Sequence, residues 1–330
     1  MRVLVIGAAG MIGRKLAAAL AREGALGGVS ISAAHLIDLV APVAPAAARF
    51  ATTCEALDLT AAGAPERLIA TRPDVVFLLA AIVSGQAERD FEKGYSVNLD
   101  ATRGLFEAIR HERSASSGAY FPRVIFASSI AVFGAPFPEA IGDDFHTTPL
   151  TSYGAQKAIG ELLLADYSRR GIFDGIGMRL PTICVRPGPP NAAASGFFSG
   201  IIREPLSGRE AILPVSDTVR HWHASPRAAV GFFLHAAGLD LSRLGARRNL
   251  TLPGVSATVG EQIEALRRVA GGNVVSLIRR QPDETIARIV AGWPSRFETV
   301  RAAALGFVAE KSFDEIIRVY QEDDHVAAVA

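Results

Sequence analysis

Residues 3–13 of this 330-residue chain read VLVIGAAGMIG, and this stretch decides the expected fold. Its four leading apolar residues suit a short buried strand, whereas the segment that begins at Met11 has helical character. Gly7 would make the tight turn between them, Gly10 would let the backbone approach a bound group, and Gly13 would let the helix pack closely on the strand. A helix that begins at such a turn attracts phosphate groups to its N-terminus. The stretch therefore predicts a dinucleotide-binding site.

Short apolar runs rich in Val, Ile and Leu recur through the first half of the chain. They are Val3 to Ile6, His35 to Val40, Val75 to Leu79 and Val124 to Ala127, and a further strand at Gly175 to Leu180 would complete a sheet. Segments of helical character separate them: Met11 to Arg22, Pro65 to Thr71, Val97 to Glu112 and Ser152 to Arg170. The runs are apolar throughout, which suits parallel strands covered on both faces. We therefore predict an α/β fold built on a Rossmann-type doubly wound parallel sheet.

The composition changes after Arg186 to prolines, glycine and then small residues through Gly200, which do not suit a helix or a central strand. We expect residues 1–186 to form the nucleotide-binding Rossmann domain. Residues 187–330 would form a smaller mixed α/β substrate-binding lobe, from which some C-terminal segments can return to the first domain. The expected helices of this half are Ser225 to Ala237, Thr258 to Ala270, Pro282 to Ala291 and Ser312 to Glu322, with a short strand at Val274 to Ile278 and, in the first half, a surface loop at Ala41 to Ala51.

The overall composition narrows the class of partner. With 34 basic and 33 acidic residues, the chain lacks the strong field expected of a nucleic-acid binder, so a small molecule is the expected partner. Cys54 and Cys184 are too few for a disulfide framework and have no zinc-site spacing, which fits a cytoplasmic protein. The longest apolar stretch, Val75 to Val83, is far shorter than the roughly 20 residues that span a bilayer. We expect no membrane insertion.

Asp38, at the end of the second apolar run, indicates which dinucleotide binds. A carboxylate at this place accepts hydrogen bonds from the hydroxyls of the adenosine ribose and repels a 2'-phosphate. It lies further from the glycines than usual, and the segment from Gly24 to Ala34 reads as an insertion that explains the excess. No Arg or Lys follows Asp38 before Arg49. These features favour NAD over NADP.

Tyr153 and Lys157 are four residues apart on an expected helix, so their side chains share one face. A free tyrosine has a pKa of about 10, and an adjacent ammonium lowers it, so the pair can supply a general base. Upstream, the run that ends in Ser128 and Ser129 puts hydroxyls at the carboxyl end of a strand, where open parallel sheets bind ligands. Ser129 is therefore expected to meet Tyr153 over the nicotinamide. Ala80, Ala81 and Asn98 stand at other expected strand ends, where small residues leave room for a cofactor.

Together these motifs resemble the extended short-chain dehydrogenases, the NAD-dependent epimerase/dehydratase family, over nearly the whole chain. The resemblance implies a homodimer formed through the helices around 97–112 and 152–170. It also implies a cofactor site made by Gly7, Gly10, Met11, Ile12, Gly13, Asp38, Asp58, Leu59, Ala80, Ala81, Asn98, Ser128, Tyr153, Lys157 and Pro181, with Asp58 near the adenine and Pro181 near the nicotinamide. Two residues depart from the family pattern: Leu78 stands where many members have His, and Phe133 replaces a frequent Tyr.

A narrower resemblance concerns the stretches 80–88, 180–188, 191–195 and 201–206, which are similar to members of the family that act on sugar acids. It implies that the C2 hydroxyl of a four-carbon sugar acid is oxidised to a 2-oxo acid with NAD. Such an acid requires a cation, and a guanidinium can hold a carboxylate with two parallel hydrogen bonds. Arg220 is the first choice, with Arg186 and Arg203 as alternatives. Ser84, Ser129, Tyr153 and Asn191 are the other expected substrate contacts.

Two other functions remain open at this point. A nucleotide-sugar epimerase or dehydratase with tightly bound NAD would share every cofactor residue, but it must hold a nucleotide diphosphate, and residues 191–200 offer little basic charge. A nonenzymatic NAD-responsive regulator would be expected to lose Tyr153 or Lys157, and this chain keeps both. His221 and His223 flank Trp222 without nearby acidic or Cys ligands, so we expect them in a strand or turn and predict no metal site.

Overall fold

A computed structural model describes residues 1–188 and 194–325 of the chain. These residues form two compact units. The first contains Met1–Val132, Thr151–Arg179 and Val230–Leu250, and the second contains Phe133–Leu150, Leu180–Ala229 and the chain from Thr251 onward. Each unit therefore takes segments that lie far apart in the sequence, and each has a core of its own.

The first unit is built on a seven-stranded sheet with the order β12-β8-β7-β6-β1-β4-β5. Its strands are β1 (Arg2–Ile6), β4 (Ala33–Asp38), β5 (Ala51–Ala56), β6 (Val75–Leu78), β7 (Arg123–Ser129), β8 (Asp174–Leu180) and β12 (Asn249–Thr251). The pairings of β1 with β4 and β6, of β4 with β5 and of β6 with β7 are all parallel. The order reverses direction at β1, as in a doubly wound sheet, so the predicted Rossmann-type fold is confirmed.

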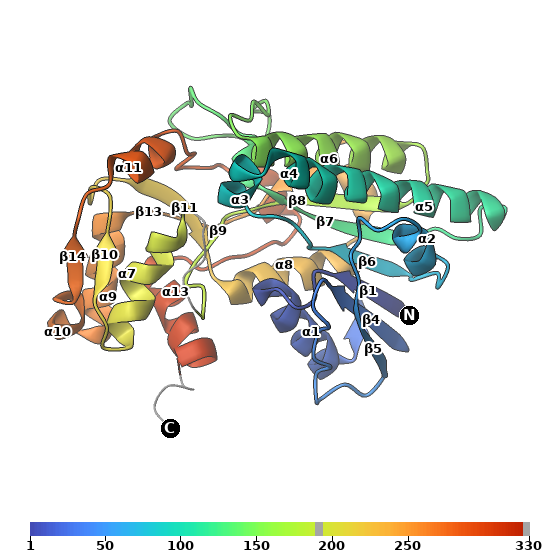
Figure 1. Ribbon diagram of the computed structural model, residues 1–330, viewed down its shortest axis with the longest axis horizontal. Coiled ribbons are helices and arrows are strands. Elements are labelled where there is room, and N and C mark those ends of the chain that lie inside the picture. The colour runs from blue at the N-terminus through green and yellow to red at the C-terminus, as the bar shows by residue number, and fades with distance from the viewer. Residues whose placement is uncertain (189–193, 326–330) are drawn as a thin grey trace. The chain divides into compact units, whose positions relative to one another are not determined.

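Helices cover both faces of this sheet, as Figure 1 shows. On one face lie α2 (Ala64–Ile69), α5 (Ala101–Ala115) and α6 (Ser152–Arg169), and on the other lie α1 (Met11–Glu23) and α8 (Pro226–Gly238). The core under α5 and α6 contains fully buried side chains such as Phe106, Phe126 and Phe173. On the α8 side, the ring of Phe233 packs edge to face on Phe77, 6.3 Å between centroids. Coverage of both faces explains why the central strands are apolar throughout.

Strand register places the expected site residues at one edge of the sheet. Ile6, at the end of β1, lies opposite Ile37 in β4 and Leu78 in β6. Leu78 in turn lies opposite Phe126 in β7. The residues that follow these positions therefore emerge at the carboxyl ends of four neighbouring parallel strands, where open α/β sheets bind their ligands.

Two features of the first unit were not predicted from the sequence. The strand β5 begins at Ala51 and pairs along its whole length with β4, although its sequence ATTCEA is not an apolar run. The segment read as an insertion between residues 24 and 34 forms a small antiparallel hairpin of β2 (Ala25–Leu26) and β3 (Val29–Ser30). The backbone of that hairpin approaches α8 closely, since a Cβ on Gly27 would lie 2.9 Å from the Cα of Gly238.

The second unit surrounds a three-stranded sheet with the order β13-β11-β9. Its elements are β9 (Thr182–Ile183), α7 (Gly196–Leu206), β10 (Ala211–Leu213), β11 (Arg220–Ala224), β13 (Val255–Thr258), α9 (Val259–Ala270), α10 (Gly272–Val275), β14 (Ile278–Arg280), α11 (Glu284–Ala291), α12 (Val300–Ala304) and α13 (Phe313–Tyr320). Their core includes Phe198, Ile202, Leu266 and Ile317. The mixed α/β character predicted for the second part of the chain is confirmed.

Two expectations for the second unit were wrong. The segment through Gly200 was expected to exclude a helix, yet α7 begins at Gly196, because the apolar residues after it give the helix a buried face at Phe198, Ile201 and Ile202. The strand expected at Val274 to Ile278 is shifted: residues up to Val275 are helical, and the strand begins at Ile278, where it pairs with β10. Within the described ranges 1–188 and 194–325, no helix is both long and apolar enough to span a bilayer.

Candidate active site

The turn between β1 and α1 has a backbone that only glycine suits. Gly7 has a φ of 95°, and a Cβ there would lie 2.6 Å from the backbone nitrogen of Ala80. A Cβ on Gly13 would lie 2.1 Å from the carbonyl oxygen of Gly7. Gly10 is exposed and begins α1 without a side-chain cap, which leaves the N–H groups of the first helical turn for a ligand. The turn thus fits a pyrophosphate, and Met11 and Ile12 lie in that first turn.

Asp38 ends β4 beside this turn. Its Oδ2 accepts a hydrogen bond of 2.9 Å from the backbone of Ala9, and its Oδ1 accepts one of 2.7 Å from Leu39. Each carboxylate oxygen has two acceptor positions, so the same side chain can still receive ribose hydroxyls. Asp58 is exposed, and two hydrogen bonds from Thr60 lower the pKa of its carboxyl. Both carboxylates are therefore placed to accept further hydrogen bonds from a ligand.

The segment after β6 is fixed by a buried amide. Asn98 accepts from the backbone N–H of Ile82 at 2.8 Å and donates to its carbonyl at 3.0 Å. It also donates to the side chain of Gln156, one residue before Lys157. Asn98 lies in a short π-helical segment, Ser96–Asp100, a departure from α-helix that often marks functional sites. The structure thus shows Asn98 holding the loop that carries Ala80 and Ala81.

Tyr153 and Lys157 lie on the first turns of α6, whose N-cap Thr151 accepts from the backbone of Gly154 at 3.0 Å. The Nζ of Lys157 is 5.8 Å from the centroid of the Tyr153 ring and 4.8 Å from that of Phe126. Only 1% of Lys157 is exposed. Burial lowers the pKa of its ammonium to about 8, and the nearby Glu161 carboxylate opposes this shift. A partly desolvated cation beside a phenol is suited to stabilise a phenolate.

The two serines at the end of β7 differ in their surroundings. Ser129 is partly exposed, and its Oγ accepts from the backbone of Ala131 at 3.1 Å, which leaves its hydroxyl proton for donation. Ser128 is buried and donates to Glu161 at 2.6 Å. The guanidinium of Arg179 donates to the same carboxylate from Nε at 2.9 Å and from Nη2 at 2.7 Å. Ser128 therefore belongs to a buried ionic cluster and not to the open side of the site.

Sequence reasoning missed Glu161 and Arg179. Glu161 stands four residues after Lys157, so helical spacing alone puts both on one face of α6. Arg179 follows the buried apolar stretch Ile176 to Met178 of β8, and a charge at such a place requires a partner. These two signals together could have predicted the ion pair.

Two of the remaining expected residues, Pro181 and Arg220, lie in the second unit. Pro181 is buried just before β9. Arg220 begins β11, is partly exposed, and donates to Glu261 at 3.1 Å and to the backbone of Ser256 at 3.3 Å. Asn191 lies outside the described residues. Ser84, in the first unit, begins the short helix α3 (Ser84–Arg89) and is partly exposed.

His221 and His223 lie on β11, as expected of a strand. His221 lies between Thr182, 2.6 Å from its Nε2, and the carbonyl of Pro294, 2.9 Å from its Nδ1. Burial lowers the pKa of His221 to about 4, so the ring is neutral at physiological pH. In the described part of the chain, no group of three or more His, Cys, Asp or Glu side chains could hold a metal ion.

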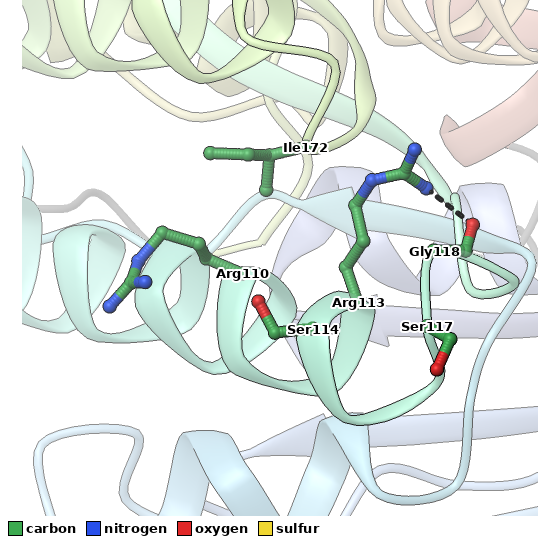
Figure 2. Close-up of a pocket in the computed structure, with 6 residues that line it drawn as sticks. All are labelled: Arg110, Arg113, Ser114, Ser117, Gly118 and Ile172. Carbon is green, nitrogen blue, oxygen red and sulfur yellow. Dashed lines mark hydrogen bonds between the residues drawn. The ribbon is translucent and has the colours of Figure 1, made fainter.

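A pocket of about 470 Å³ lies elsewhere in the first unit, at the end of α5 (Figure 2). It is lined by Arg110, Arg113, Ser114, Ser117, Gly118 and Ile172. Gly118 and Ile172 precede β7 and β8, so the pocket opens at the amino-terminal edge of the sheet, opposite the edge that carries the site. Arg113 donates to the carbonyl of Gly118 at 2.8 Å, and Arg110 is paired with Glu107. We therefore place the candidate active site at the carboxyl edge and not in this pocket.

The glycine turn, the acidic strand end and the Tyr153–Lys157 pair on a Rossmann-type sheet define the class of extended short-chain dehydrogenases. Comparison with protein families agrees, because the model of the NAD dependent epimerase/dehydratase family matches residues 3–224. The chain therefore belongs to this family, and NAD is its cofactor.

Individual relatives extend over the full length. The chain is 48% identical to a D-erythronate dehydrogenase of Cupriavidus necator, covering 99% of this chain and 100% of that protein. It is 42% identical to a D-erythronate dehydrogenase of Haemophilus influenzae, covering 98% and 100%. Among solved structures, it resembles a protein described as the nucleoside-diphosphate-sugar epimerase from Agrobacterium tumefaciens, with 62% identity, a TM-score of 0.96, and coverage of 99% of this chain and 95% of that one.

Proposed function

We propose that this protein is an NAD-dependent dehydrogenase that oxidises the C2 hydroxyl of D-erythronate, or of a closely related four-carbon sugar acid, to the 2-oxo acid. The observation that carries the proposal is the full-length similarity to two proteins named D-erythronate dehydrogenase, at 48% and 42% identity. The side chains of Tyr153, Lys157 and Ser129 supply the groups that such an oxidation requires.

In the proposed mechanism, Tyr153 acts as the general base. As a phenolate it takes the proton of the substrate hydroxyl, which weakens the C2–H bond. The hydride of C2 would then leave to bound NAD, which would supply the hydride acceptor. The Lys157 ammonium stabilises the phenolate and holds the nicotinamide ribose. The hydroxyl of Ser129 donates to the substrate oxygen and orients C2 toward the cofactor.

The cofactor would be held along the carboxyl edge of the first unit. The first turn of α1, between Gly10 and Gly13, would hold the pyrophosphate, and the Asp38 carboxylate would accept hydrogen bonds from the adenosine ribose. Asp58 and Leu59 would lie beside the adenine, and Pro181 beside the nicotinamide. A negative charge at Asp38 also opposes a 2'-phosphate, which supports a preference for NAD over NADP.

The carboxylate of the acid would be held by Arg220. Its present partner is the exposed Glu261, whose carboxylate also caps the N-terminus of α9 by accepting from the backbone of Thr258 at 2.7 Å. A substrate carboxylate can replace this partner with a two-pronged contact, since such geometry favours guanidinium groups. Ser84 and Asn191 remain proposed polar contacts to the sugar hydroxyls.

A second candidate function rests on the solved structure described as a nucleoside-diphosphate-sugar epimerase, at 62% identity. An epimerase would use the same cofactor residues but would return the hydride to its substrate and release no NADH. It would also need cations for a diphosphate, and Arg203, one of the alternatives, is buried and paired with Glu204. We therefore favour the dehydrogenase.

The test is NADH formation by purified protein with NAD and a panel of acids that includes D-erythronate, D-threonate and L-threonate, repeated with NADP. We expect turnover on one of these acids and a loss of about 10²- to 10⁴-fold in kcat in Tyr153→Phe, with NAD binding retained. If no acid of the panel gives NADH and the protein purifies with NAD bound, the epimerase is favoured. Turnover that survives Tyr153→Phe would remove this residue from the mechanism.

A further inference from the structure

The ionic cluster formed by Ser128, Glu161 and Arg179 lies directly behind the residues assigned to catalysis. Ser128 and Ser129 are neighbours at the end of β7, and Glu161 is one helical turn from Lys157 on α6. Arg179 belongs to β8, the next strand of the sheet. The three side chains therefore connect β7, α6 and β8 at the edge where the chemistry is proposed.

The cluster of Ser128, Glu161 and Arg179 is largely buried, unlike an ion pair on the surface. The side chains of Glu161 and Arg179 are 3% and 12% exposed. Both oxygens of Glu161 are engaged: Oε1 accepts from Ser128 and from the Arg179 Nε, and Oε2 accepts from the Arg179 Nη2 at 2.7 Å. A buried carboxylate whose two oxygens are both hydrogen-bonded is held in one orientation.

Glu161 follows Lys157 by four residues on α6, so the two side chains share one face of that helix. The groups near the Lys157 ammonium are the Tyr153 ring on the same helix, the Phe126 ring of β7 and the Glu161 carboxylate. Of these, Glu161 carries the negative charge that favours the protonated lysine against the effect of burial. Arg179 donates to both oxygens of the same carboxylate, so its positive charge offsets part of the negative charge of Glu161. On β12, the Asn249 amide donates to the Glu161 backbone carbonyl and adds no charge.

We propose that Glu161 is a positioning residue for the reaction: it anchors the end of β7 that carries Ser129 and keeps Lys157 in its charged form. This inference rests on the proposed function for its catalytic consequence but not for the state of Lys157. Arg179 and Ser128 act through Glu161 by fixing its carboxylate. A purely structural ion pair would tie β8 to α6 without any influence on the lysine proton.

The direct test observes the Lys157 proton without substrate or cofactor. The chain contains four lysines, Lys15, Lys93, Lys157 and Lys311, so NMR of protein carrying isotopically labelled lysine, with Lys157→Met for assignment, can follow the Lys157 Nζ signal through a pH titration. Glu161→Gln keeps the shape of the side chain and removes its charge. We expect Lys157 to lose its proton at lower pH in this variant than in the wild type. An unchanged Lys157 titration in a folded variant would overturn the proposal.

Arg179→Gln supplies the second variant, since it removes the opposite charge. Here Glu161 is no longer neutralised, so Lys157 should keep its proton to higher pH than in Glu161→Gln. If Lys157 loses its proton at the same pH in both variants, or at a lower pH in Arg179→Gln than in Glu161→Gln, a role that depends on charge is contradicted. Because either substitution breaks a buried pair, the double variant Glu161→Gln, Arg179→Gln serves if one single variant does not fold.

Turnover gives the catalytic arm of the test. With the acid that the panel identifies, kcat of Glu161→Gln should fall by roughly tenfold or more at neutral pH, and its alkaline limit should move to lower pH in step with the NMR titration. If no acid in the panel is oxidised, the proposed function fails while the lysine titration still decides the present inference. A kcat profile that stays at the wild-type position while Lys157 titrates lower would overturn the catalytic part of the proposal.

Discussion

At the scale of single residues, Asp38 tests the choice of cofactor. Its carboxylate accepts from the backbone of the glycine turn and of Leu39, so it is held at the strand end where a ribose would lie. We expect Asp38→Ser to lower kcat/KM with NAD and to raise it with NADP, which changes the NAD-to-NADP ratio by roughly 10- to 100-fold, because a hydrogen bond to a charged group is worth about 1.5–3 kcal/mol.

The matched control is Asp74→Asn. Asp74 also accepts from a backbone N–H, that of Arg2, but at the amino-terminal edge of the sheet. Its substitution should leave the cofactor ratio unchanged. Steady-state kinetics with both cofactors provides the measurement, and a ratio that does not change in Asp38→Ser would show that the ribose is held by another group.

Arg220 tests the assignment of the substrate carboxylate. We expect Arg220→Ala to raise KM for the acid by about 10- to 100-fold with a smaller effect on kcat, since a charge-assisted hydrogen-bonded contact is lost in binding. Arg220→Lys should recover only part of the affinity, because an ammonium cannot make the two-pronged contact. The control is Arg267→Ala, whose exposed guanidinium is paired with Glu264. An unchanged KM in Arg220→Ala would exclude this residue and leave Arg186 or Arg203.

At the scale of secondary-structure elements, the contact of α6 with β7 depends on a glycine. A Cβ on Gly160 would lie 2.8 Å from the ring of Phe126, the ring against which Lys157 packs. Gly160→Ala should therefore destabilise the protein by roughly 1–3 kcal/mol through overpacking, although alanine is the better helix former. Gly231→Ala in α8 is the matched control.

Gly231 is exposed and nothing lies within 4 Å of the position of its Cβ. We expect Gly231→Ala to raise the stability by about 0.5–1 kcal/mol, as for an open position in a helix. Urea unfolding of the two variants measures both effects. Equal signs in the two variants would show that Phe126 moves aside at little cost and that packing does not limit this helix.

The strands of the first unit show which elements could be predicted from the sequence. The strands β1, β6 and β7 were predicted because a doubly covered parallel strand is apolar throughout, and the register at their ends places the glycine turn, Asp38 and Ser129 at one edge. The strand β5 was missed, since only three of its six positions are even partly buried and its pairing with β4 comes from backbone hydrogen bonds that any sequence can make. Local pattern detects a core, but it does not detect an edge strand.

The local sequence pattern also failed to predict the partners within the buried ionic cluster, for a different reason. Glu161, Arg179 and Ser128 meet only because β7, α6 and β8 are neighbours in the folded sheet, and they lie up to 51 residues apart in the chain. Sequence spacing linked Tyr153 with Lys157 because both lie on one helix. The resemblance assigned Ser128 to the cofactor site, and the structure adds that its hydroxyl donates to Glu161.

At the scale of the whole molecule, the catalytic role proposed for Lys157 carries a cost in the stability of the fold. The side chain is 1% exposed, and burial lowers its pKa from 10.5 to about 8. The unfolded chain therefore binds this proton more tightly than the folded protein. Below pH 8 Lys157 is protonated in both the folded and the unfolded state, and the folded state carries the full cost of the buried charge. Between pH 8 and 10.5 the folded state loses the proton first. The contribution of Lys157 to the free energy of unfolding therefore becomes less unfavourable as the pH rises.

Lys157→Met removes that cost while it keeps a side chain of similar length. We expect the variant to be inactive and more stable than the wild type by up to roughly 3 kcal/mol below pH 8, with the difference shrinking toward pH 10.5. Calorimetry of both proteins without NAD, over a series of pH values, measures the difference directly. Lys93→Met, at an exposed position of α4 (Phe91–Tyr95), should show little difference at any pH. A Lys157→Met protein less stable than the wild type at neutral pH would mean that the attraction of Glu161 outweighs the desolvation of the ammonium, and the fold would then gain stability from the same charge that the chemistry requires.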